Sequence, residues 1–382
     1  MNTRAQPLAR LSLPAIDTPL PRRDVKALRP QGRAAEAEVH HFHTHDGQRL
    51  FYRRWPAQGA TRRGAVLMFH RGHEHSGRMA HLVDELDLPD FDLYAWDARG
   101  HGHSPGERGY SPSFMSSVRD VQTFVDHIGA THGVAVEDMH VVAQSVGAVL
   151  AATWAHDYAP RLRGLTLASP AFQVKLYVPF ARPALRLMHA LRGHFVVNSY
   201  VKPEFLTHDR ARIASYKADP LISRPIAVGM LLGLYEAAER VVADAQAITQ
   251  PVQLLISGSD WVVHQAPQHR FFDRLGSAVK TKTVLDGFFH DTLGERDRAG
   301  AVAEIRMLYA AVPWMPWAFG QLLKGSNHLP RNKLRLSLLR QETGFMGVGA
   351  YRQHFFGEAS MRDVAQFFVN EMARYSGTAL RL

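Results

Sequence analysis

The stretch VVAQSVGAVLAATW, residues 141–154, decides the fold expected for this chain. It starts with β-branched apolar residues, passes through AQSVG at 143–147, and continues in small residues that suit a helix. A strand, a sharp turn and a helix are the setting in which the pattern G-x-S-x-G presents a nucleophilic serine. Ala143 replaces the first glycine of that pattern, and serines after strands are usually caps or turn residues. Whether Ser145 is a nucleophile therefore depends on the rest of the chain.

Strand and helix patterns alternate on both sides of this stretch. Continuous apolar runs bounded by turn residues are typical of buried parallel strands. They predict strands at residues 64–70, 91–97, 139–144, 162–169 and 251–258. A more alternating run at 278–285 predicts a strand nearer an edge, and Asp46-Gly47 predicts a hairpin turn ahead of them all. Helical patterns occupy 113–130, 147–157 and 295–310. We expect an α/β fold with a mostly parallel, doubly wound sheet that binds ligands beyond its carboxyl edge.

One long insertion and two unlike ends interrupt this alternation. Residues about 170–248 are mostly helical and combine apolar with basic positions, as expected of a lid with an interface-seeking face. A helical subdomain whose apolar face is simply core is the alternative. We expect a main domain at 36–311, a basic flexible tail at 1–35, and a helical extension of unknown role at 312–382.

The positive charge of the chain lies in its two ends. Residues 1–33 hold seven Lys and Arg against two Asp and Glu, and residues 312–382 hold nine against four. The middle, 34–311, holds 29 of each kind. Peripheral contact with an anionic membrane and plain solvation of the ends both fit this distribution. Nucleic-acid binding is not expected, because no recognition-helix, finger or RNP pattern occurs.

Composition excludes several classes of protein. The chain has no cysteine, so disulfide scaffolds, thiolate nucleophiles and Cys-ligated metals are excluded. No apolar run approaches the roughly 20 residues needed to span a bilayer, and the N-terminus lacks the apolar core of a signal peptide. We expect a cytoplasmic protein, peripheral to the membrane at most, whose oligomeric state the sequence leaves open.

An acid and a base follow Ser145 in the order Ser, Asp, His that this strand–turn–helix setting requires. The run LLISGSDWVVH ends a strand and places Asp260 on the next loop, and VLDGFFHDTLGE does the same for His290. Since parallel strands end at one edge of the sheet, the three side chains can converge. His290 would then be the general base for Ser145, oriented by Asp260. Two neighbours, His264 and Asp291, lie close enough in sequence to be mistaken for these residues.

The same edge offers two N–H donors for an oxyanion. One is Val146, directly after the nucleophile, and the other is Gly72 in the loop after strand 64–70, with Arg71 as the less favoured neighbour. Histidines on the nearby loops suggest a metal site, but no H-E-x-x-H spacing occurs. We therefore expect neither a metal nor a cofactor.

Three longer motifs give a family resemblance. FHRGHEHSGRMAHL is similar to an H-G-x-G-E-H-S-x-R loop, DARGHGHSPGERGY to a D-x-R-G-H-G-x-S-x-G-x-R segment, and LTHDRARIASYKADPL to a lid exit. In these motifs residues 36–311 resemble the α/β-hydrolase superfamily, in particular the monoglyceride lipase and lysophospholipase branch related to serine aminopeptidase S33. The resemblance implies a serine hydrolase without cofactor or metal. It places the nucleophile, acid, base and oxyanion donors at Ser145, Asp260, His290, Gly72 and Val146.

Departures from the family pattern concern the substrate. Arg71 and His73 replace two glycines of the H-G-x-G loop, and Gln144 replaces the histidine of the usual G-H-S-M-G elbow. We expect all three to bear on substrate binding. Arg71 either pairs with a phosphate or carboxylate of the substrate or forms a salt bridge within the protein.

The variant motifs also resemble the hydrolase half of bacterial fusions that carry a class I methyltransferase. This chain has no acidic residue followed by G-x-G-x-G after a strand, and GFMGVGAYRQ is a poor substitute. No methyltransferase activity is predicted for it.

Three functional hypotheses result. The leading one is a serine hydrolase that cleaves carboxylic esters of acyl lipids, of the monoacylglycerol or lysophospholipid class. The second is an esterase or thioesterase acting on small soluble acyl substrates. The third, from a different class, is a catalytically idle scaffold that binds a membrane surface. Acyl length and head group are not set by the sequence.

Overall fold

The computed structural model describes residues 32–178 and 180–311 of the 382-residue chain, with side chains described as far as residue 306. The predicted helical extension at 312–382 and nearly all of the predicted basic tail lie outside the described residues. The membrane contact predicted for these two segments also lies outside the described residues. In the part that is described, no helix is both long and apolar enough to cross a bilayer.

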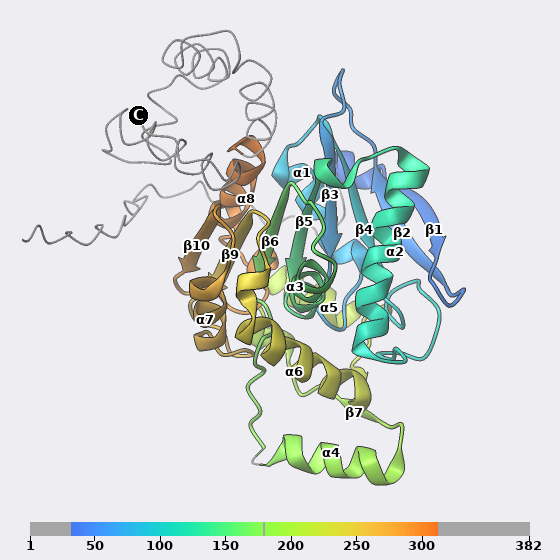
Figure 1. Ribbon diagram of the computed structural model, residues 1–382, viewed down its shortest axis with the longest axis vertical. Helices are drawn as coiled ribbons and strands as arrows, with labels where there is room; N and C mark the ends of the chain where they lie inside the picture. Colours follow the sequence, from blue (N-terminus) through green and yellow to red (C-terminus); the bar gives the residue numbers. More distant parts are fainter. Residues whose placement is uncertain (1–31, 179, 312–382) are drawn as a thin grey trace, which may run out of the picture. The chain divides into compact units, whose positions relative to one another are not determined.

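An eight-stranded sheet runs through the domain in the order β1-β2-β4-β3-β5-β6-β9-β10 (Figure 1). β1 is antiparallel to β2 and β2 to β4, and every other neighbouring pair is parallel. All strands expected from the apolar runs are present, within two residues of the expected bounds. The strands span Glu38–His43 (β1), Arg49–Trp55 (β2), Gly64–Phe69 (β3), Phe91–Trp96 (β4), Met139–Gln144 (β5), Gly164–Ala168 (β6), Val252–Ser257 (β9) and Lys280–Leu285 (β10).

The hairpin between β1 and β2 turns where the Asp-Gly pair predicted it. Gly47 has φ +81°, a left-handed conformation that glycine adopts without steric cost. Its N–H donates to the carbonyl of Thr44 at 2.9 Å, which closes the turn. The hairpin forms the antiparallel edge of the sheet, on the side away from β9 and β10.

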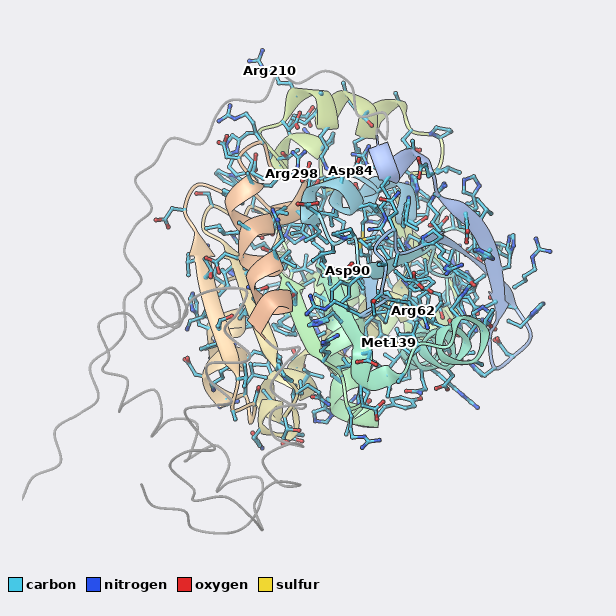
Figure 2. All side chains as sticks on the ribbon, turned by 90° about the horizontal axis from the view of Figure 1, so that it is seen from above. Arg62, Asp84, Asp90, Met139, Arg210 and Arg298 are labelled. Atoms are coloured by element: carbon cyan, nitrogen blue, oxygen red, sulfur yellow. The ribbon has the colours of Figure 1, made fainter. Side chains whose placement is uncertain are left out.

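Helices cover both faces of the sheet, which explains why the central strands are apolar along their whole length. In β3, Leu67 packs into the core under α2 and α3, while Val66 packs into the opposite core under α1 and α8. Arg298, which lies just before α8, forms an ion pair with Glu85 of α1 at 2.6 Å, and Figure 2 labels Arg298 on the same side of the molecule as Asp84, the neighbour of Glu85. The helices flanking the sheet span His81–Leu86 (α1), Phe114–His132 (α2), Val146–Tyr158 (α3), Val228–Ala243 (α6), Ala266–Arg274 (α7) and Ala299–Ala311 (α8).

The insertion between β6 and β9 has two unlike parts. It holds α4 (Ala181–Arg192), β7 (Val196–Asn198), α5 (Arg210–Ala218), β8 (Pro225–Ala227) and α6. The antiparallel pair β7–β8 was not predicted from the sequence. The core interpretation holds for α6, eight of whose residues are buried, but not for α4, which has no buried residue. Figure 1 draws α4 at the far end of the insertion, beyond α6.

Short 3₁₀ helices complete the described chain. They span Gly32–Ala35 (η1), Ser76–Met79 (η2), Val136–Asp138 (η3), Pro203–Phe205 (η4), Ala245–Ala247 (η5) and Thr292–Gly294 (η6). η2 lies in the loop after β3, and η6 lies in the loop after β10. Both loops therefore lie at the carboxyl edge of the sheet, where β5 also ends.

Candidate active site

Ser145 occupies the sharp turn between β5 and α3. Its φ is +56° and its ψ is −116°, a strained conformation for a residue with a side chain, with a cost of about 1–3 kcal/mol. Its N–H donates to the carbonyl of Ala168 at 3.0 Å, and its carbonyl accepts from Val149 and Ala171. Neighbouring backbone therefore holds the turn from both sides. Such a strained turn aims the serine hydroxyl beyond the strand end.

The two small residues of the elbow have different reasons to be small. A Cβ atom on Gly147 would lie 2.4 Å from the carbonyl oxygen of His70, so no larger residue fits there. Ala143 lies inside β5, is fully buried, and pairs in register with Phe69 and Leu167. A strand position accepts a methyl group without strain, which explains why alanine replaces glycine in this elbow.

Ser145, His290 and Asp260 form a continuous hydrogen-bonded chain. Ser145 Oγ lies 2.7 Å from His290 Nε2, and His290 Nδ1 lies 2.8 Å from Asp260 Oδ2. The second carboxylate oxygen of Asp260 accepts from the N–H groups of Val262 and Val263, at 2.7 and 2.9 Å. This arrangement requires Nδ1 to carry the proton and leaves Nε2 free to accept from the serine. The sequence had placed these three residues on separate loops, and the structure brings them together.

The electrostatics of Asp260 suit a permanent anion. Its side chain is fully buried, and burial by itself would raise its pKa. The neighbouring His290 and the two backbone N–H donors outweigh burial and lower the pKa of Asp260 below its usual value. A charged carboxylate can thus stabilise an imidazolium next to it.

Two unpaired N–H groups lie beside the nucleophile. Neither the Gly72 nor the Val146 N–H donates a hydrogen bond to any described residue. The two positions are adjacent, since a Cβ on Gly72 would lie 3.2 Å from Val146 Cγ2. Free donors at this place are what an oxyanion hole needs. Their role in catalysis stays a prediction.

His70 holds the loop that carries Gly72. Its Nε2 accepts from the N–H of Ala98 at 3.1 Å, so Nδ1 carries the proton and donates to the carbonyl of Arg71 at 2.7 Å. His73 follows Gly72 with φ +69°, where the family motif has glycine. Burial, with the charge of Arg71 adding to it, lowers the pKa of His73 to about 4, so its ring is neutral at pH 7. A substrate contact by His73 stays a prediction.

Arg71 and Gln144 have partners inside the protein. Arg71 Nη2 donates to Glu74 at 2.8 Å, and its Nε lies 3.9 Å from a carboxylate oxygen of Asp291. The amide of Gln144 donates to Asp291 at 3.0 Å and to the carbonyl of His290 at 3.2 Å. Of the two alternatives for Arg71, the internal salt bridge is present, while direct contact of either residue with substrate stays a prediction.

Sequence reasoning missed two members of this polar group. From the sequence, Asp291 stood out only as a neighbour that could be mistaken for the orienting acid, Asp260. Arg212 stood out only as part of the lid-exit motif. The available signal was that both residues are charged and lie within the quoted motifs, Asp291 in VLDGFFHDTLGE and Arg212 in LTHDRARIASYKADPL. Among the described residues, no group of three or more His, Asp or Glu side chains gathers as a metal site.

The strand order, the elbow and the loops at the carboxyl edge define an α/β hydrolase. Residues 60–297 match the model of the family "Serine aminopeptidase, S33", and the chain belongs to this family. It is 60% identical over 267 residues to the uncharacterized protein YnbC of Escherichia coli, covering 70% of this chain and 46% of that protein. It is 27% identical over 261 residues to mouse monoglyceride lipase, covering 66% of this chain and 83% of the lipase.

Solved structures agree on the fold. A monoacylglycerol lipase of Paleococcus ferrophilus superposes with a TM-score of 0.61 at 23% identity, covering 68% of this chain and 97% of the lipase. A soluble variant of the Saccharomyces cerevisiae monoglyceride lipase, in complex with a substrate analog, gives 0.63 at 18%, covering 71% and 94%. The chain spans about half or less of the first curated relatives, 46% of YnbC and 27% of a Dictyostelium discoideum protein with an abhydrolase domain. The resemblance to the hydrolase half of methyltransferase fusions stays a prediction.

Proposed function

We propose that this chain is a serine hydrolase that cleaves carboxylic esters of acyl lipids through an acyl-enzyme on Ser145. The observation that carries the proposal is the Ser145–His290–Asp260 chain, with contacts of 2.7 and 2.8 Å, beside two free N–H groups. Nucleophile, general base and orienting acid are thereby each assigned to one residue, which favours acyl transfer over a scaffold role.

The proposed reaction uses each of these groups in turn. His290 Nε2 takes the proton of Ser145 Oγ as the oxygen attacks the ester carbonyl, and Asp260 stabilises the imidazolium. The N–H groups of Gly72 and Val146 receive the negative oxygen of the tetrahedral intermediate. His290 then returns the proton to the departing alcohol, which leaves the acyl group on Ser145. A water molecule, activated in the same way, releases the acid.

The lipid class of substrate rests on relatives and on the insertion. Mouse, human and rat monoglyceride lipases are 26–27% identical to this chain over about two thirds of it. The lid segment carries apolar side chains in water, such as Leu187 at 62% exposure and Leu191 at 79%. Together these features support monoacylglycerol or lysophospholipid as the substrate class.

One observation favours the second candidate, an esterase or thioesterase for small soluble acyl substrates. The site is closed in this conformation: Ser145 is 5% exposed and His290 is 2% exposed. A small ester needs a smaller opening than a long acyl chain. Turnover of soluble esters of two to four carbons, compared with monoacylglycerols of long chain, distinguishes the two substrate classes.

The test of the proposed function is Ser145→Ala with fluorophosphonate labelling. The wild-type chain should take one fluorophosphonate on Ser145 and hydrolyse acyl esters. Ser145→Ala should take none and lose all but a small fraction of turnover, about 10³-fold or more. Ser169→Ala is the matched control, a second buried serine beyond a strand end. A folded Ser145→Ala variant that keeps most of its activity would contradict the proposal.

A further inference from the structure

Three side chains meet that are sequence neighbours of the proposed catalytic groups. Arg71 precedes Gly72, Gln144 precedes Ser145, and Asp291 follows His290. Arg71 and Asp291 lie in the loops after β3 and β10, and Gln144 is the last residue of β5. Each is the sequence neighbour of a residue with a proposed catalytic role. A contact among them therefore links the loops after β3 and β10 to the end of β5.

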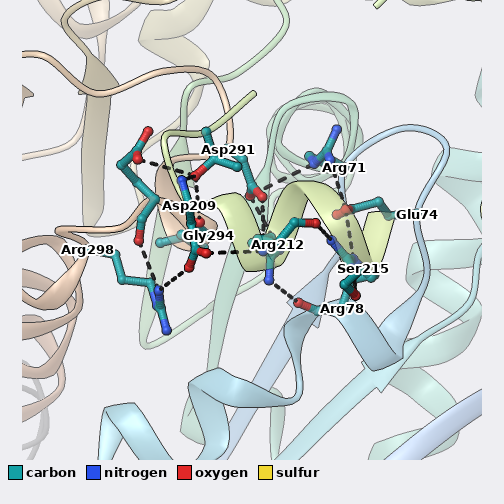
Figure 3. Close-up of polar contacts among 12 residues, drawn as sticks. Arg71, Glu74, Arg78, Asp209, Arg212, Ser215, Asp291, Gly294 and Arg298 are labelled. Carbon is teal, nitrogen blue, oxygen red and sulfur yellow. Dashed lines mark hydrogen bonds and ion pairs between the residues drawn. The ribbon is translucent and has the colours of Figure 1, made fainter. Parts of the chain in front are cut away.

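Asp291 is the centre of this contact. One of its oxygens accepts from the Gln144 amide at 3.0 Å and lies 3.9 Å from Arg71 Nε. The other accepts from Arg212 Nε at 2.5 Å (Figure 3). Its side chain is 1% exposed, so burial would raise its pKa, but the charges of Arg212 and Arg71 lower it well below its usual range. Asp291 is thus a fixed anion within the protein.

A second carboxylate fixes Arg71 from the other side. Glu74 accepts from Arg71 at 2.8 Å and from Arg78 Nε at 3.1 Å, and both arginines lie over the ring of Tyr216. Burial would raise the pKa of Glu74, and the two guanidinium groups lower it. Arg71 is therefore held between two anions, one on its own loop and one beside His290.

Helix α5 of the insertion joins the cluster through its backbone as well as through its charge. Arg212 donates to the carbonyl of Arg78, and Arg78 donates to the carbonyl of Arg212 and to Ser215. A Cβ on Gly294 would lie 2.0 Å from Arg212 Nε and 2.2 Å from Asp291 Oδ2, so glycine leaves the room that this ion pair occupies. Helix α5, the loop that carries Arg78 and the residue Gly294 therefore all pack around the Asp291–Arg212 ion pair.

We propose that Arg71, Gln144 and Asp291 are positioning residues, which hold Gly72, Ser145 and His290 at the spacing that ester hydrolysis requires. The inference rests on the proposed function. Two of the three, Arg71 and Gln144, stand at positions where the family motifs have glycine and histidine. A displacement of about 1 Å between reacting groups can cost on the order of 100-fold in rate. These residues act on the rate through the protein, without touching the substrate.

The experiment compares Asp291→Asn, Arg71→Met and their double variant with wild type. Turnover of a neutral and of an anionic short acyl ester is measured and divided by the number of sites titrated with a fluorophosphonate. We expect kcat per titrated site to fall about 10- to 100-fold in each single variant, with KM for both esters changed less than about threefold. The double variant should fall little further than the worse single variant, because both changes break one contact. Arg71→Lys should recover part of the loss.

One control variant separates positioning from stability, and the pattern of kcat and KM separates it from substrate binding. Asp92→Asn removes an equally buried carboxylate at the amino end of β4, where it accepts from Ala57, Tyr94 and Arg54. It should lower the melting temperature and leave kcat per titrated site unchanged. If Arg71 binds the substrate instead, Arg71→Met raises KM for the anionic ester alone and leaves kcat unchanged, which would overturn the inference.

The remaining outcomes are also decisive. If Asp291→Asn does not fold, Gln144→Met and Arg71→Met carry the test, because each keeps the Asp291–Arg212 pair. An active wild type whose folded variants keep full kcat per site would overturn the inference and leave the proposed function intact. A wild-type chain that takes no fluorophosphonate and hydrolyses no ester would overturn the proposed function itself, and the inference with it.

Discussion

A Cβ atom on Gly147 would lie 2.4 Å from the carbonyl oxygen of His70, so the first turn of α3 touches the start of the loop that carries Gly72. Gly147, the one glycine in this elbow, is therefore needed for packing between α3 and the loop after β3. Gly147 permits the sharp turn at Ser145, and its close contact with His70 also fixes the distance between the proposed nucleophile and the proposed oxyanion donors.

Gly147→Ala is expected to harm both stability and turnover. The methyl group meets backbone atoms, which cannot turn away, so the free energy of unfolding should fall by about 1–3 kcal/mol. Movement of His70 also displaces Gly72, so kcat should fall more than stability alone explains. The measurement is urea denaturation beside turnover of a short ester. Gly300→Ala in α8 should be neutral or stabilising, since among the described residues no atom outside the adjoining helix backbone lies within 4 Å of the added Cβ.

Asp260→Asn tests the direction of the proton relay. Two N–H groups, from Val262 and Val263, donate to Oδ1, so the asparagine carbonyl must stay on that side. Its NH₂ group then faces His290 Nδ1 and forces the other tautomer, whose Nε2–H points at Ser145. We expect kcat to fall on the order of 10³- to 10⁴-fold while fold and melting curve change little. A loss of less than tenfold in the folded variant would show that Asp260 does not orient His290.

Much of this site follows from the sequence for a physical reason. Parallel strands end at one edge, so Asp260 and His290, each just past a strand, had to come near Ser145. The continuous apolar runs likewise predicted a sheet covered on both faces. The position of Gly72 followed in the same way from the loop after β3.

The contacts among charged loop residues could not be predicted in this way. The distance between Arg71 and Arg212, 141 positions apart, depends on how the insertion folds back, and the motifs record no such distance. The strand pair β7–β8 escaped notice because three-residue strands carry almost no periodicity. The exposure of α4 was also open, since an amphipathic helix fits a core and an interface equally well.

The partly buried His81, whose ring is neutral at pH 7, is expected to make the fold sensitive to mild acid. Burial, with the charges of Arg212 and Arg298 adding to it and Glu85 opposing, lowers the pKa of His81 to about 4. In the unfolded chain its pKa is about 6.5. Between these values only the unfolded state binds the proton, so the free energy of unfolding should decrease as pH falls from about 6.5 to about 4. Above pH 6.5 this contribution is constant.

Urea denaturation at pH 7.5, 6.0 and 5.0 measures this slope. His81→Gln keeps a donor toward the carbonyl of Leu293, which His81 Nε2 contacts at 2.7 Å, but cannot titrate. The variant should therefore lose less stability than wild type between pH 7.5 and pH 5.0. Equal losses in both proteins would mean that His81 does not contribute to the acid sensitivity.

The exposed side of α4 is expected to matter only for substrates presented at an interface. Leu187 and Leu191 are one helical turn apart and are 62% and 79% exposed, while Arg182 and Arg186 tie the helix to glutamates of α6. A leucine fully withdrawn from water contributes about 1.5–3 kcal/mol, so losing two should weaken adsorption at least about tenfold. The double variant Leu187→Glu, Leu191→Glu should thus lose turnover on monoacylglycerol vesicles and keep it on a soluble short ester. Met115→Glu, at a 44% exposed position of α2, is the matched control. An equal loss of turnover on both substrates would mean that the α4 substitutions act on the catalytic site and not on binding to the lipid surface.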